Sequence, residues 1–116
     1  MTMNYHLRSM PSAQCHVEFI TDYGCLKEVR LVSYSTAILS VKYHDADADV
    51  EVMYPVDCSK TTARHVNRFT QELLGTNAYH DLKKLGVGCT MRFEGCAVCI
   101  SNLHTEYLNY GKHFHY

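Results

Sequence analysis

The stretch of sequence that decides the fold is residues 57–75, DCSKTTARHVNRFTQELLG. Apolar side chains recur in it at helical spacing, while basic side chains spaced four apart line another face. The hydroxyl of Ser59 or Thr61 can cap the first turn, and Gly75 suits the left-handed residue that commonly follows a helix. We therefore predict a helix over about residues 60–74 that lies on a sheet. Its predicted apolar stripe is Ala63, Val66, Phe69 or Thr70, and Leu73.

Four runs of alternating apolar and polar residues precede this helix, at 14–20, 27–33, 37–43 and 49–54. This alternation is typical of strands with one buried face. The links between the runs are short, which favours an antiparallel meander. The side chains expected to face inward are Cys15, Val17, Phe19, Val29, Leu31, Ala37, Leu39, Val41, Tyr43, Val50, Val52 and Tyr54.

The flanking segments are less regular. In the N-terminal region, residues 8–12 read as a loop or short turn, and residues 77–85 read as a short second helix stopped by Gly86 and Gly88. Residues 89–93 and 96–101 favour a C-terminal hairpin. We predict an α+β fold, an antiparallel sheet of about four strands packed by one main helix, in a single domain spanning residues 1–116.

The composition is typical of a globular protein, with 47% hydrophobic and 20% charged residues. The N-terminus lacks the apolar region of a signal peptide, and no apolar run approaches the roughly 20 residues of a membrane span. We therefore expect a cytoplasmic protein. The net charge of −1 argues against a general nucleic-acid binder. Residues 1–58 carry four Lys or Arg against eight Asp or Glu, whereas residues 59–116 carry seven against four.

Two of the six cysteines, Cys96 and Cys99, have the C-x2-C spacing used by zinc and thiol redox sites. Further ligands would come from His104 and from His113 or His115. The second cysteine pair of a strong zinc motif is missing, and Cys96 and Cys99 would lie on opposite sides of a strand. We expect no metal and no other cofactor, and interpret the cysteines as reduced and most of them as small core residues.

An acidic row forms the first candidate binding surface. In an extended chain its side chains share one face at intervals of roughly 6.6 Å and could mimic the phosphates of a nucleic acid in the channel of another protein. The alternative is a solvated, acidic edge strand that resists aggregation. The acidic row consists of Asp45, Asp47, Asp49 and Glu51.

A basic ridge on the predicted helix, made of Lys60, Arg64 and Arg68, forms the second candidate. It could bind phosphate or an acidic protein surface, or be a solvated helix face. His65 lies beside Thr61 and Thr62, but no Asp or Glu nearby on the helix would orient it as a catalytic base. We interpret His65 as a structural, hydrogen-bonding residue and expect no enzymatic activity.

Residues 59–69 are similar to a Ser-x-Thr-Thr-x-x-His-x-x-x-Phe motif. It belongs to a family of small uncharacterised proteins in phages and mobile elements of gut Firmicutes. A Ser-Tyr-x-Thr turn of that family is matched by residues 33–36, and its N-terminal Arg-x-Ser-Phe-type loop is matched only loosely by residues 8–11. The resemblance covers about residues 8–74 and departs after Gly75. It implies a phage or prophage accessory protein and transfers no activity.

In that setting, a small protein without catalytic residues is expected to act by binding. The leading hypothesis is an anti-CRISPR-like inhibitor of a bacterial defence nuclease that uses the acidic row or the basic ridge. The alternative is a DNA-binding regulatory module that uses the ridge on phosphates. A zinc or redox protein based on Cys96 and Cys99 is the third hypothesis, and a homodimer remains open.

Overall fold

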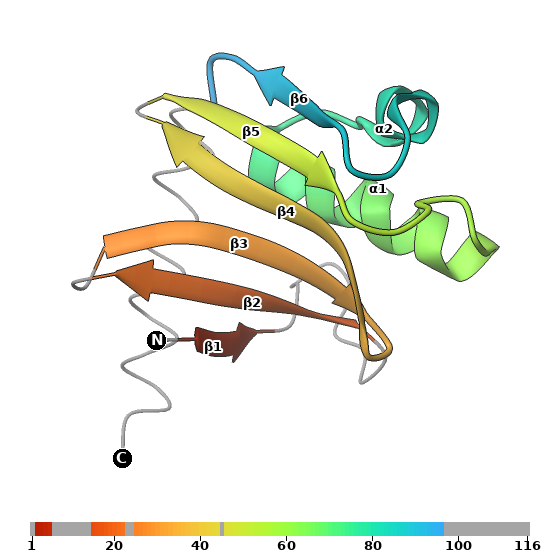
Figure 1. The fold of residues 1–116 in the computed structure, drawn as a ribbon, viewed down its shortest axis with the longest axis horizontal. Helices are drawn as coiled ribbons and strands as arrows, with labels where there is room; N and C mark the ends of the chain where they lie inside the picture. The colour runs from red at the N-terminus through yellow and green to blue at the C-terminus, as the bar shows by residue number, and fades with distance from the viewer. Residues whose placement is uncertain (1, 6–14, 23–24, 45, 97–116) are drawn as a thin grey trace.

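The computed structural model describes residues 2–5, 15–22, 25–44 and 46–96. They form one sheet with two helices packed on one of its faces (Figure 1). In chain order, the elements are β1 (Thr2–Tyr5), β2 (Cys15–Asp22), β3 (Cys25–Ser33), β4 (Thr36–His44), β5 (Asp47–Val52), α1 (Lys60–Leu74), α2 (Tyr79–Leu85) and β6 (Thr90–Phe93).

The six strands lie in the order β1-β2-β3-β4-β5-β6, and every neighbouring pair is antiparallel. The predicted α+β fold with an antiparallel sheet is confirmed, and the four predicted strands correspond to β2–β5. The prediction missed β1, whose four residues are too short to show a clear alternation. Residues 8–12 lie outside the described residues, as does most of the second strand of the predicted C-terminal hairpin. The first strand of that hairpin, β6, pairs with β5.

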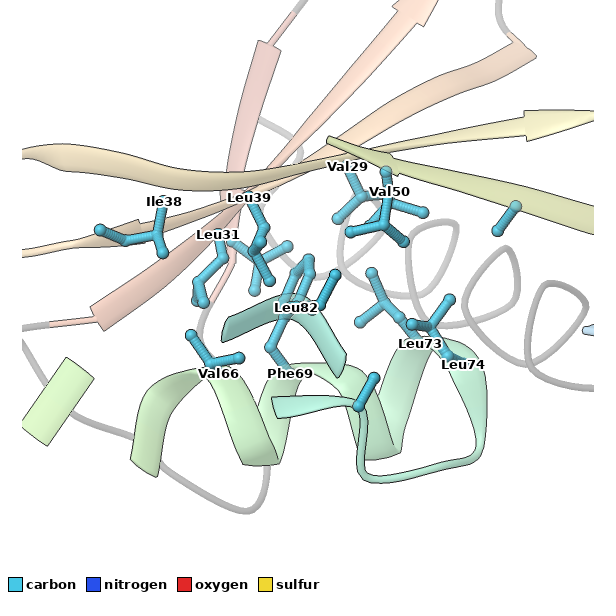
Figure 2. Packing of buried hydrophobic residues seen from close by; sticks show 14 of the residues in the cluster. Val29, Leu31, Ile38, Leu39, Val50, Val66, Phe69, Leu73, Leu74 and Leu82 are labelled. Carbon is cyan, nitrogen blue, oxygen red and sulfur yellow. The ribbon is translucent and has the colours of Figure 1, made fainter. Parts of the chain in front are cut away.

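Helix α1 begins and ends where its capping residues predict. Ser59 Oγ accepts a hydrogen bond of 3.0 Å from the backbone N–H of Thr62, and Gly75 has the left-handed φ of 74°. Val66, Phe69 and Leu73 are fully buried and face the side chains of the central strands (Figure 2). The helix therefore presents one apolar stripe to the sheet and leaves the opposite face to solvent.

A β-bulge changes which side chains of β4 reach this core. Leu31 lies opposite Leu39 and Val32 lies opposite Ala37, so Ile38 is an extra residue in β4. Ile38 and Leu39 are both buried and both belong to the hydrophobic core (Figure 2), whereas Ala37, which was predicted to face inward, is half-buried. Strict alternation cannot predict this arrangement.

The fourth predicted strand is displaced by two residues. β5 ends at Val52, and Ala48, Val50 and Val52 form its buried face. Tyr54, predicted to be inward, follows the strand and is 45% exposed. The N–H of Met53 still donates a 2.8 Å hydrogen bond to the carbonyl oxygen of Ile38 on β4. The chain leaves the sheet after it, before Pro55, which lacks the N–H needed to continue the ladder.

Candidate functional site

The basic ridge lies on the solvent face of α1. Lys60, Arg64 and Arg68 are all exposed, and successive members are one turn apart, so the ridge follows the helix for about 12 Å. Among the described residues, none of the three has a carboxylate within 4.0 Å. Within the part of the chain that the structure describes, the ridge is thus a row of three cations without a carboxylate partner, on a helix whose other face packs on the sheet.

The acidic row has a different environment. Asp47, Asp49 and Glu51 are half-buried on the face of β5 opposite to the core, while Asp45 lies outside the described residues. β5 pairs with β4 on one side and β6 on the other, so the row lies inside the sheet. The alternative interpretation as an edge strand is therefore wrong, because β6 covers that edge.

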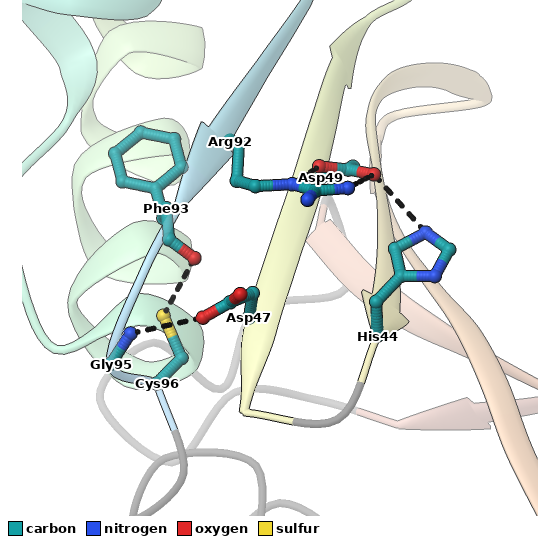
Figure 3. A network of polar contacts seen from close by, with 7 residues as sticks. All are labelled: His44, Asp47, Asp49, Arg92, Phe93, Gly95 and Cys96. Carbon is teal, nitrogen blue, oxygen red and sulfur yellow. Dashed lines mark hydrogen bonds and ion pairs between the residues drawn. The ribbon is translucent and has the colours of Figure 1, made fainter.

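Asp49 is compensated by two neighbours (Figure 3). Arg92 of β6 donates hydrogen bonds of 2.8 Å and 3.1 Å to its two carboxylate oxygens, and His44 Nε2 lies 3.1 Å from Oδ2. Asp47 accepts a 3.3 Å hydrogen bond from the backbone N–H of Gly95. The pKa of Asp49 is lowered, chiefly by the hydrogen bonds from Arg92 and also by the charges of Arg92 and His44.

Replacing Arg92 with alanine is therefore expected to raise the pKa of Asp49 toward 3.8. Carboxyl carbon chemical shifts followed against pH by NMR measure this change. Arg30→Ala is the matched control, because Arg30 contacts the carboxylate of Glu28. It is expected to raise the pKa of Glu28 and to leave that of Asp49 in place. An unchanged Asp49 pKa in Arg92→Ala would show that the pair does not form in solution.

Glu28 shows that charge compensation extends across this face of the sheet. Its carboxylate accepts hydrogen bonds from Arg30 and from Ser40 Oγ, the latter at 2.7 Å, and Lys42 lies directly opposite on β4. Burial raises the pKa of Glu28, but the hydrogen bonds from Ser40 and Arg30 and the charges of Arg30 and Lys42 outweigh it, so the pKa is lowered. A face on which several carboxylates already have cationic neighbours is a poor mimic of a phosphate chain.

His65 joins α1 to the hairpin between β3 and β4. Its Nδ1 lies 2.9 Å from Ser33 Oγ, and both residues are 3% exposed. Burial, followed by the charge of Arg64, lowers the pKa of His65. The imidazole is thus a buried, hydrogen-bonded group, as the interpretation of His65 as a hydrogen-bonding residue predicts. The contact also unites the two sequence motifs, residues 33–36 and 59–69, that carry the resemblance.

The cysteines show no metal-binding arrangement in the described part of the chain. No group of three or more His, Cys, Asp or Glu residues there lies close enough to hold a metal ion. Cys96 is buried, with Sγ 3.6 Å from the carbonyl oxygen of Phe93, and Cys99, His104, His113 and His115 lie outside the described residues. Burial raises the pKa of Cys15 to about 11, which disfavours its reactive thiolate.

Sequence reasoning missed the arginine and the apolar side chains that define the surface. Arg92 occupies an exposed position in the short alternating segment 90–93. A cation on a strand of this kind could have predicted a partner for the carboxylates of the acidic row. Among the residues whose side-chain exposure is described, Tyr34, Met53, Tyr54 and Val87 are the exposed large hydrophobic ones. The dipeptide Met53-Tyr54 immediately before Pro55 was the signal for an exposed apolar loop.

Comparison with known proteins identifies no relative of this chain, so any proposal about its function has to be argued from the fold and these surfaces. No protein-family model matches the chain, and no significant match appears among curated proteins or solved structures. The resemblance to the phage and mobile-element family stays a prediction. Among the helices of the described chain, neither has the length and apolar character required to cross a membrane.

Proposed function

We propose that this protein acts by binding a partner protein through the basic ridge on α1. The observation that carries the proposal is the contrast between the two charged surfaces. The cations of the ridge have no carboxylate neighbour among the described residues, whereas Asp49 of the acidic row is paired with Arg92. Desolvating the ridge against carboxylates of a partner would satisfy its charges.

The proposed partner is a bacterial defence nuclease, which the protein inhibits in an anti-CRISPR-like manner. The resemblance to phage and mobile-element proteins supports this setting. Bacterial defence nucleases act against phages and mobile elements, so an accessory protein of such an element would benefit it by inhibiting a nuclease complex. The basic ridge then contacts an acidic patch of the effector. We place the acidic row second, because its compensated charges give it little attraction for a nucleic-acid channel.

The alternative function is DNA binding by the same ridge. Three exposed cations in line on one helix could contact phosphates along a duplex. Three phosphate contacts give a weak, salt-sensitive interaction, and the chain carries a net charge of −1. Duplex DNA binding that weakens steeply with salt, and that is lost in Arg64→Ala/Arg68→Ala, would establish this alternative.

Reversing two charges of the ridge tests the proposal. Wild-type protein is expected to block nuclease interference in a bacterial host and to co-purify with the nuclease complex. Arg64→Glu/Arg68→Glu is expected to weaken both by about tenfold or more, because like charges against an acidic surface are repulsive. The matched control is Lys83→Glu/Lys84→Glu, which reverses two exposed charges on α2 and is expected to retain both activities. Failure of the wild-type protein in both assays would refute the proposed function.

A further inference from the structure

One polar side chain beside the basic ridge has a buried atom that the fold leaves unpaired. Asn67 is half-buried on α1, and its amide oxygen Oδ1 is buried. Among the described residues, this oxygen has no hydrogen-bond partner. A buried amide oxygen gives up its hydrogen bonds to water, so leaving it unpaired lowers the stability of the folded chain. The free protein therefore carries a cost at this position.

In the described chain, the hydrogen bonds of the fold do not involve the amide oxygen of Asn67. The hydroxyl of Thr70 donates a 3.2 Å hydrogen bond to residue 67, but it does so to the backbone carbonyl, which any residue would supply. Asparagine is also a weaker helix former than alanine or leucine, since its amide competes for backbone groups. Asn77 provides the contrast, because its Oδ1 accepts a 3.4 Å hydrogen bond from the N–H of Tyr79 at the start of α2.

The position of Asn67 places its amide beside the basic ridge. Asn67 lies three residues after Arg64 and directly before Arg68, and side chains three or four residues apart are neighbours on a helix surface. Both arginines are exposed, and neither has a carboxylate partner among the described residues. A partner that covers these two guanidinium groups therefore also covers residue 67.

The chemistry of an amide indicates what the partner carries. A guanidinium group only donates hydrogen bonds, whereas an amide also has an oxygen that accepts them. A chain of phosphates offers acceptors alone, while a protein surface offers N–H and O–H donors among its carboxylates. We propose that Asn67 is a specificity-determining residue of the ridge, and that its amide turns outward on binding to accept a hydrogen bond from the partner protein. This inference rests on the proposed function and distinguishes its protein partner from the DNA phosphates of the alternative.

Two polyanions of defined chemistry test the inference on the full-length protein. Poly-L-glutamate presents carboxylates together with backbone N–H donors, whereas inorganic polyphosphate presents acceptors alone. Asn67→Leu is expected to weaken the binding of poly-L-glutamate by about fivefold, the usual effect of one hydrogen bond, and to leave the binding of polyphosphate unchanged. Arg64→Ala/Arg68→Ala is expected to weaken the binding of both probes and to reduce its salt dependence. Calorimetric titration at two salt concentrations measures these affinities.

Unfolding in urea separates this role of Asn67 from a structural one. Leucine has nearly the shape of asparagine without its polar atoms, so Asn67→Leu is expected to be at least as stable as the wild type. Asn77→Leu is the control, because it removes the oxygen that accepts the Tyr79 N–H. It is expected to lower the urea midpoint while binding both probes as the wild type does. A lower urea midpoint in Asn67→Leu would show that its amide supports the fold and would overturn the inference.

The other outcomes separate this inference from the proposed function. Equal losses with both probes in Asn67→Leu, no loss with either, or no binding of poly-L-glutamate by the wild type would overturn the inference. Full nuclease inhibition by Asn67→Leu would also overturn it, while leaving the proposed function standing. A loss confined to poly-L-glutamate, in a protein that inhibits no nuclease, would support the contact of Asn67 with a protein partner and refute the nuclease as that partner.

Discussion

Phe69→Ala is expected to lower the free energy of unfolding by about 3–5 kcal/mol. Phe69 is fully buried at the centre of the contact between α1 and the sheet, beside Val66 and Leu73 (Figure 2). Truncation removes the ring from the core and leaves a cavity that the sheet cannot close. Urea unfolding followed by circular dichroism measures the loss. Native domains have a free energy of unfolding of only about 5–15 kcal/mol, so this single change is expected to remove a large part of the stability.

Arg68→Ala is the matched control, since Arg68 immediately precedes Phe69 and is exposed. It is expected to change the stability by less than about 0.5 kcal/mol. The two variants also separate the roles of the helix. Arg68→Ala should weaken partner binding in a stable protein, whereas Phe69→Ala should lose binding through loss of the fold. Equal stability of both variants would mean that α1 does not close the core.

The sequence predicts the central part of this fold because local signals agree there. Val17 and Phe19 alternate with polar residues on β2, and Ser59 and Gly75 mark the ends of α1. Periodicity, capping and turn chemistry all act within a few residues of the chain, so they can be read without knowledge of distant contacts. The same local logic placed Lys60, Arg64 and Arg68 on the solvent face.

The features that sequence reasoning missed depend on residues far apart in the chain. Ile38 reaches the core because a bulge shifts the pairing of two strands, and no composition signal marks that bulge. Arg92 meets Asp49 across 43 positions because β6 returns to pair with β5 after both helices. Because of that pairing, the acidic row is not a set of free carboxylates: Asp49 is neutralised in part by Arg92.

Charge counted along the sequence therefore does not rank the two candidate sites. Counted along the sequence, the acidic row holds four carboxylates against the three cations of the ridge. In the folded chain, the availability of a charge depends on its neighbours, and Asp49 shares its oxygens with Arg92 and His44. The cations of the ridge have no carboxylate neighbour among the described residues, because helical spacing places them on the face of α1 that points away from the sheet.

Stability is expected to fall as the pH is lowered from about 7 to 5, with His65 as one cause. The folded protein holds the pKa of His65 below its ordinary value of 6.5, by burial and by the charge of Arg64. Below pH 6.5 the unfolded chain therefore binds a proton at this position that the folded chain resists. Linkage then requires the stabilisation by neutral His65 to be complete above pH 6.5 and to be lost as the pH falls toward the folded pKa.

Comparison of the wild type with His65→Gln isolates this contribution. One proton limits the slope to about 1.4 kcal/mol per pH unit, so urea unfolding at closely spaced pH values can detect it. His65→Gln keeps a polar group near Ser33 Oγ but removes the titration, so its stability should depend less steeply on pH between 7 and 5. His80→Gln, at an exposed position on α2, should keep the wild-type slope. Equal slopes in all three proteins would show that His65 accepts its proton as readily in the folded chain as in the unfolded one. The contact with Ser33 would then not hold α1 on the hairpin through a neutral imidazole.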